Sequence, residues 1–239
     1  MKLRNIAVIG GGSLLVAAIG AGVWLYSSLD SLIKSAIETY GPQITGVSVK
    51  VGSVKLSPTS GQGTIKGLRL GNPSGFKTGY ALSLSEISVS LDPASLTGNL
   101  LLIREILVSG ADVSYEKVGN TTNLEAIQRN VDAYMRKFGG GQASAGGPQK
   151  KMIIDRLTIR STKVNLTSGL TAGSTITTSI PDVNLRDIGK RTNGATAGEV
   201  VRQVIGALTA SVTRAATAAL GNITKGAGKA ADSVRGLFR

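Results

Sequence analysis

The feature that most constrains this chain is an uncharged run of 21 residues near its start, IAVIGGGSLLVAAIGAGVWLY from Ile6 to Tyr26. A helix rises about 1.5 Å per residue, so a helix over this run is about 31 Å long. Because the hydrocarbon core of a bilayer is about 30 Å thick, the run predicts a transmembrane anchor over residues 1–27. Trp24 and Tyr26 at its end are typical of the headgroup region.

The charges on either side of the run predict its orientation. Lys2 and Arg4 precede it, and Asp30 is the first charge after it. The positive-inside rule therefore places the N-terminus in the cytoplasm and the bulk of the chain across the membrane. A cleaved signal peptide is the alternative, with small residues at Ala18 and Gly20, but the apolar run is longer than the usual 7–15 residues.

Two further sets of residues are candidates for contact with helices or membranes. Ser13, Ala17 and Ala21 recur every four residues along the anchor, and small residues at this spacing let two helices approach closely. The C-terminal tail combines basic residues with Leu237-Phe238, which predicts either a basic amphipathic helix at a membrane surface or a frayed terminus. The basic candidates are Lys225, Lys229, Arg235 and Arg239.

The composition limits the chemistry that the chain can perform. It has no cysteine and no histidine, so it lacks disulfides, thiolate ligands and the commonest general base. Its 14 acidic residues are scattered, and the nearest pairs, Asp112/Glu116 and Asp182/Asp187, fall in strand or turn sequence. We therefore expect no enzyme activity, no metal and no cofactor. The net charge is +13, but basic residues stand singly and aromatics are 4%, which favours anionic lipid or solubility over nucleic acid.

After Thr45, apolar and polar residues alternate, which predicts β-strands. One strand changes phase at Gly52-Ser53, a glycine-centred shift that is typical of a β-bulge. Another carries Leu82 and Leu84 in one phase and Ile87, Val89 and Leu91 in the other. The strands are expected at residues 45–56, 65–70, 81–91, 100–108, 111–118, 152–160, 163–167, 174–180 and 182–185, with Ser109-Gly110 separating the fourth from the fifth.

Three helices are predicted beyond the anchor. An amphipathic helix over 28–40 is ended by Gly41-Pro42, and a second runs over 123–138 with Thr122 or Asn123 as its cap. The third covers 196–223, and its polar face is mostly Ser and Thr, which indicates contact on more than one side. Its two arginines, Arg202 and Arg214, argue against a second membrane span.

These elements predict an α+β fold that is mainly antiparallel β, with a curved or groove-like sheet and flanking helices. Residues 28–138 form a β-rich domain with an amphipathic helix at each end. A flexible Gly-rich linker follows over 139–150, residues 151–195 continue the sheet, and residues 196–239 form the C-terminal helix and the basic tail.

Three stretches carry a resemblance to a known family: ISVSLDPASLTGNL from Ile87, IREILVSGADV from Ile103 and GNTTNL from Gly119. With the preceding strands and the N-terminal anchor, residues 44–130 resemble the N-terminal domain of the AsmA-like envelope proteins. The resemblance implies a groove-shaped sheet with an apolar inside, phospholipid as the ligand, and a bacterial inner-membrane protein with its bulk in the periplasm. GLRLGNPSGF from Gly67 is also similar to the Asn-Pro loop of LEA/WHy-type β-sandwiches.

We expect a membrane-anchored, AsmA-like protein that binds or helps transfer phospholipid through an apolar groove. The alternative function is a structural subunit of a membrane-anchored homo-oligomer without lipid transfer. Periodicity does not separate a lipid groove from a packed core. The lipid-facing candidates are Leu82, Leu84, Val89, Leu91, Ile103, Val108, Val113, Leu157, Ile159, Val164 and Leu166.

The expected sheet is short for a protein that connects two membranes. About nine strands at about 4.8 Å spacing extend about 40–45 Å. We therefore expect membrane lipids as partners together with further copies of the chain or a larger envelope protein, and no nucleic acid.

Overall fold

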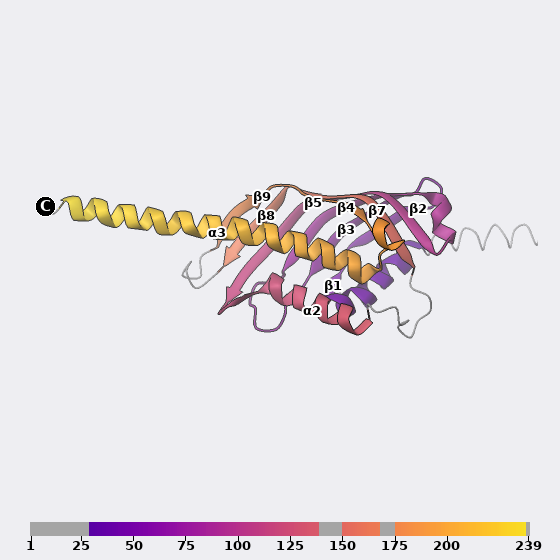
Figure 1. Cartoon of the computed structure of the whole chain (residues 1–239), viewed down its shortest axis with the longest axis horizontal. Coiled ribbons are helices and arrows are strands. Elements are labelled where there is room, and N and C mark those ends of the chain that lie inside the picture. Colours follow the sequence, from indigo (N-terminus) through magenta and orange to yellow (C-terminus); the bar gives the residue numbers. More distant parts are fainter. Residues whose placement is uncertain (1–28, 139–149, 168–174, 238–239) are drawn as a thin grey trace, which may run out of the picture.

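The computed structural model of the chain describes residues 29–138, 150–167 and 175–237, with side chains up to residue 221 (Figure 1). The predicted anchor over 1–27 and nearly all of the linker lie outside the described residues. Ten strands form one sheet, with helices against it. The α+β class and the mainly antiparallel sheet are therefore confirmed. The sheet is uncurled, and helices rather than a rolled sheet enclose its apolar face.

The strands cross the sheet almost in chain order. Every pairing is antiparallel except those of β5 with β7 and β8, which are parallel. The main path is β1 (Val49–Lys50), β3 (Gln62–Leu70), β4 (Leu82–Leu91), β5 (Leu100–Val118), β7 (Lys151–Arg160) and β10 (Val183–Ile188). Beside this path, β2 (Ser53–Ser57) pairs with β3, β6 (Thr121–Thr122) with β5, and β8 (Thr162–Thr167) with β5 and β9 (Ile176–Ile180).

Helices α2 (Asn123–Phe138) and α3 (Ala197–Leu237) contact each other and the sheet. Parallel strands need a crossover connection, and α2 lies in the connection between β5 and β7. Thr122 caps α2, as predicted: its Oγ1 accepts from the Glu125 N–H at 3.2 Å, and Glu125 Oε2 accepts from the Thr122 N–H at 2.9 Å. Figure 1 shows α3 running across the strands and continuing past the end of the sheet. The short 3-10 helices are η1 (Pro93–Thr97) and η3 (Lys190–Thr192).

The first described helix is longer than predicted, because it spans residues 29–45 and passes through Gly41-Pro42. The Pro42 carbonyl still accepts a helical bond, from the Gly46 N–H at 2.9 Å. Gly46 has a φ of 69°, and this left-handed conformation ends the helix. Glycine rather than proline therefore ends this helix.

This helix seals one edge of the sheet. Asp30, Lys34 and Glu38 stand four residues apart, so they share one face of the helix, and all three bond to the backbone of the edge strand and the turn before it. The bonds are Leu56 N–H to Asp30 Oδ1 at 2.9 Å, Val51 N–H to Glu38 Oε1 at 2.9 Å, and Lys34 Nζ to the Gly52 carbonyl at 3.1 Å. The side chains thus take the place of a further strand. At the opposite edge, β9 and β10 each pair with a described strand on one side and with no described strand on the other.

A line across the sheet breaks the regular alternation of side chains. Along this line, six neighbouring strand segments each direct two consecutive residues to the outer face, away from α2 and α3, between two that face inward. We call this line the pleat shift. Its outward pairs are Gly52-Ser53, Lys66-Gly67, Ser85-Glu86, Ser109-Gly110, Arg160-Ser161 and Pro181-Asp182, which lie opposite one another in the strand register.

Left-handed backbone accompanies the pleat shift on three of its six strand segments. Side chains of a regular strand alternate between faces, so two consecutive outward residues require an unusual conformation. Gly67, Gly110 and Ser161 have φ values of 64°, 64° and 56°. The register is the same on both sides of the line, so the predicted bulge at Gly52-Ser53 is wrong. Ser109-Gly110 does not separate two strands either, because β5 runs through it.

Replacing Gly110 by alanine is expected to destabilise the fold. A left-handed residue with a side chain costs about 1–2 kcal/mol, and a Cβ at Gly110 would lie 2.7 Å from Ser85 Oγ. We expect Gly110→Ala to lower the free energy of unfolding by at least that amount in denaturant titrations. Gly79→Ala is the control, because nothing lies within 4 Å of its Cβ position. Equal stability of the two variants would contradict this account.

Candidate functional site

The inner face of the sheet gathers the predicted lipid-facing residues into one apolar layer. Ten of the eleven belong to the buried core, with exposures of 9% or less, and Val89 is half-buried against it. The ten are Leu82, Leu84, Leu91, Ile103, Val108, Val113, Leu157, Ile159, Val164 and Leu166. The pleat shift is what brings Leu84 and Val108, which lie on opposite sides of it, into the same layer.

Two helices cover this layer. On α2, Leu124, Ile127 and Val131 are completely or almost completely buried. On α3, the buried residues are Ile205, Leu208, Val212 and Ala216. In the described chain the apolar layer is therefore enclosed between the sheet and these helices.

Two buried hydroxyls, one on the sheet and one on α3, lack partners within the described part of the chain. Thr162 on β8 and Thr209 on α3 are 2% and 6% exposed, and their hydroxyl oxygens have no hydrogen-bond partner among the described residues. Burial raises the pKa of the Tyr115 phenol on β5, and the hydrogen bond with the Thr213 hydroxyl on α3 lowers it by less. Each unsatisfied buried group costs about 1–3 kcal/mol, so the packing of α3 around Thr209 is less stable than purely apolar packing.

The first turn of α3, in contrast, is firmly held. Thr196 Oγ1 accepts from the Glu199 N–H at 3.3 Å, and Glu199 Oε2 accepts from the Thr196 N–H at 2.7 Å, which forms a capping box. Just before it, the backbones of Ala195 and Met152 exchange two hydrogen bonds of 2.8 Å. The helix is thus fixed to β7 at its beginning.

Among the described helices, α3 has one stretch that is apolar and long enough to cross a membrane, Ala197–Gly221, with a mean hydropathy of 1.3. Only 28% of the residues in its most apolar window are buried. Ile205, Leu208 and Val212 pack this stretch against the core. This stretch of α3 therefore covers the core with its buried face and has further apolar residues outside that face.

The other predicted contact residues fall largely outside the described part. Ser13, Ala17 and Ala21 lie outside the described residues. The backbone of α3 includes Lys225, Lys229 and Arg235, but their side chains lie outside the described part, as does Arg239.

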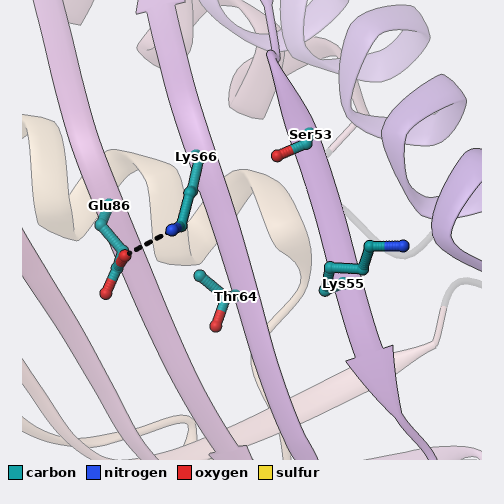
Figure 2. A pocket seen from close by; sticks show the side chains of 5 residues that line it. All are labelled: Ser53, Lys55, Thr64, Lys66 and Glu86. Carbon is teal, nitrogen blue, oxygen red and sulfur yellow. Dashed lines mark ion pairs between the residues drawn. The ribbon is translucent and has the colours of Figure 1, made fainter.

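The outer face of the sheet is polar. An open depression of about 220 Å³ is lined by Ser53, Lys55, Thr64, Lys66 and Glu86, whose side chains are drawn in Figure 2. Lys66 Nζ lies 3.4 Å from Glu86 Oε2, and Lys55 Nζ lies 3.2 Å from Asp30 Oδ2. Because both lysines are ion-paired, the depression offers no free cation to an anionic ligand.

A buried carboxylate fixes the loop before β4 against β5. Glu116 is 5% exposed and accepts hydrogen bonds from the N–H groups of Lys77 and Thr78 at 2.8 Å and from the Thr78 hydroxyl at 2.9 Å. Burial raises the pKa of Glu116, but the bonds from Thr78 and Lys77 outweigh it, so the pKa lies below its ordinary value. The carboxylate therefore holds the loop as a fixed negative charge.

Asn123 connects this loop to α2. It is completely buried, and its Nδ2 donates to Asn72 Oδ1 at 2.8 Å and to the Ser114 carbonyl at 2.6 Å. Its Oδ1 accepts from the Glu116 N–H at 3.1 Å. Sequence reasoning predicted Asn123 only as a possible helix cap and missed the link to Asn72, because the two residues stand 51 positions apart. The signal available was a set of polar residues inside otherwise apolar segments.

The described residues contain no group of three or more acidic side chains that could hold a metal ion. In comparisons with known proteins, the chain matches no family model and no curated protein sequence. Its function is therefore inferred from its residues and their arrangement.

Replacing Glu116 by glutamine is expected to destabilise the protein in a pH-dependent way. Hydrogen bonds to a charged group contribute about 1.5–3 kcal/mol, so Glu116→Gln should lower the free energy of unfolding by about this amount at pH 7. Because the folded pKa lies below the unfolded value of about 4.3, the carboxylate stabilises the fold above that pH. This contribution is lost as the pH falls through the folded pKa.

The measurement is urea unfolding of both proteins between pH 7 and pH 3. The stability difference between them should be constant down to about pH 4.3 and shrink below it. Glu86→Gln is the control, since its exposed pair with Lys66 contributes about 0–1 kcal/mol. A Glu116→Gln variant as stable as Glu86→Gln would refute the role of the carboxylate.

Proposed function

We propose that this chain is a membrane-anchored envelope protein of the AsmA-like type that binds, and helps transfer, phospholipid on the inner layer of its sheet. The proposal places it in the bacterial inner membrane, with a cytoplasmic N-terminus, the bulk of the chain in the periplasm and no enzymatic activity. The observation that carries the proposal is the nature of the cover: α3, one of the two helices over a continuous apolar layer, is apolar and carries a buried hydroxyl without a partner among the described residues.

The inner layer suits acyl chains because it is both apolar and continuous. The side chains of Leu84, Val108, Ile159 and Leu166 belong to one cluster that extends over both sides of the pleat shift. An acyl chain on this surface removes apolar area from water at about 25 cal/mol per Å². The affinity would be non-directional, so it would select acyl chains without selecting a headgroup.

Access to the layer requires α3 to move away. Its first turn is tied to β7, whereas Thr209 further along is buried with a lone hydroxyl. Water would satisfy this hydroxyl once α3 lifts, which offsets part of the cost of exposing the apolar layer. The apolar stretch Ala197–Gly221 could then enter the membrane surface while lipid takes its place on the sheet.

The second candidate function is a structural subunit of a membrane-anchored homo-oligomer. The specific observation in its favour is the difference between the two edges of the sheet. Side chains of helix 29–45 bond to one edge, whereas β9 and β10 are paired on one side only by described strands. An edge of this kind accepts a further strand.

Photo-crosslinking tests the lipid proposal. A photoreactive residue at Leu84, which faces the inner layer, should become attached to phospholipid in native membranes. The same residue at Ser85, its neighbour on the outer face, is the matched control, and we expect its labelling to be at least about fivefold lower, because the two side chains lie on opposite faces. Mass spectrometry of the purified protein identifies the adduct. Equal labelling at both positions, or none at Leu84, would refute the proposal.

Stabilising the cover should reduce lipid binding. Thr209→Val removes an unsatisfied hydroxyl while preserving shape, so it should raise the free energy of unfolding by about 1 kcal/mol and lower labelling at Leu84. Thr217→Val on the exposed side of α3 is the control, with an expected effect within about 0.5 kcal/mol. If Thr209→Val stabilises the protein but leaves labelling unchanged, lipid does not enter by displacing α3.

A further inference from the structure

The free edge of the sheet has a sequence that is complementary to itself. Residues 180–188 read IPDVNLRDI, with Asn184 at the centre. If a second copy of this segment pairs antiparallel about Asn184, Val183 meets Leu185, Ile180 meets Ile188, and the acidic Asp182 meets the basic Arg186. Asn184 then lies opposite itself, and Pro181 lies opposite Asp187.

The faces of the strand agree with this pairing. Opposed residues of an antiparallel pair point to the same side of the sheet. Asp182 and Arg186 are both exposed on the outer face, and Val183 and Leu185 both contact the inner layer. Ile180 and Ile188 are both buried in the core. The register therefore joins outer face to outer face and inner layer to inner layer.

The two charges at this edge are available for a partner. Within the described part of the chain, neither Asp182 nor Arg186 forms an ion pair. The neighbouring Asp187 is engaged, because Lys190 Nζ lies 2.6 Å from its Oδ1 and 3.2 Å from Asp155 Oδ1. Opposite charges directly across from each other stabilise a strand pair by about 0.2–1 kcal/mol, and two-fold symmetry provides the Asp182–Arg186 pair twice.

We propose that a second copy of this chain pairs with the first through antiparallel contact of their β10 strands, with the two-fold axis at Asn184. The opposite edge is bonded to Asp30, Lys34 and Glu38, so each copy has one edge to offer. Pairing therefore stops at two copies and forms no filament. The two-fold axis stands perpendicular to the joined sheet, which places both α3 helices on the same side.

This pairing deepens the structural candidate function and is independent of lipid binding. Labelling at Leu84 reports the inner layer, whereas a cross-link at Asn184 reports the edge, so either can fail while the other succeeds.

A single cysteine tests the register, because the chain contains none. Directly opposed residues of an antiparallel pair have Cα atoms about 4.5–5.5 Å apart, which suits a disulfide. We expect Asn184→Cys of the full chain, oxidised in membranes, to migrate as a disulfide-linked dimer. Thr158→Cys is the matched control, since Thr158 lies next to Asn184 one strand inward, and two copies would be about 14 Å apart.

Charge reversal tests the same contact in solution. Asp182→Arg and Arg186→Asp should each lower the dimerisation affinity of the full chain in detergent by about tenfold or more. In either variant, two pairs of like charges face each other across the contact. The double variant D182R/R186D should restore the affinity to within about threefold. Light scattering and sedimentation give the mass relative to the 24.5 kDa monomer. A monomeric wild type, a D182R variant as dimeric as the wild type, or Asn184→Cys that cross-links no more than Thr158→Cys would each overturn the proposal.

Discussion

The pleat shift is the constraint on which the rest of this structure depends. A regular strand would direct Leu84 and Ile87 to opposite faces, and the sheet would then be half apolar on each side. The pleat shift, with left-handed backbone at Gly67, Gly110 and Ser161 on three of its strands, brings both apolar phases to one face. The outer face is left to Gly, Ser, Thr and charged residues. One helical layer is therefore sufficient to cover the apolar surface.

The two cover helices differ in how they are held. Asn123, inside the first turn of α2, is completely buried and forms three hydrogen bonds, one to Asn72 in the loop before β4 and two to β5. On α3, the capping box lies in the first turn, and Thr209 further along is buried without a partner among the described residues. Buried polar groups stabilise a unique arrangement when they are satisfied and weaken it when they are not. The fold thus combines a fixed helix with one that is easier to displace.

The sequence predicted the classes of element better than their connections. Alternation identified the inner-layer residues, and the capping signal at Thr122 located the start of α2. Alternation failed at Ser109-Gly110, because a glycine within a strand looks like a turn when its left-handed conformation preserves the register. Asp30, Lys34 and Glu38 were also missed, although their four-residue spacing was visible, since nothing local shows that their partners belong to a strand edge. Asn72 and Asn123 meet only through the tertiary fold.

The order of the strands has a consequence for how this sheet is built. From β1 to β5, each new strand of the main path pairs with one made shortly before it, and β10 returns to β7. Such local pairing is expected to be faster than the parallel docking of β7 and β8 onto β5 beyond α2. A chain that is synthesised from its N-terminus therefore extends the sheet in one direction. Helix 29–45 is made first and is available to cover the opposite edge of the sheet. The last strand to join the sheet, β10, therefore keeps a free edge among the described strands.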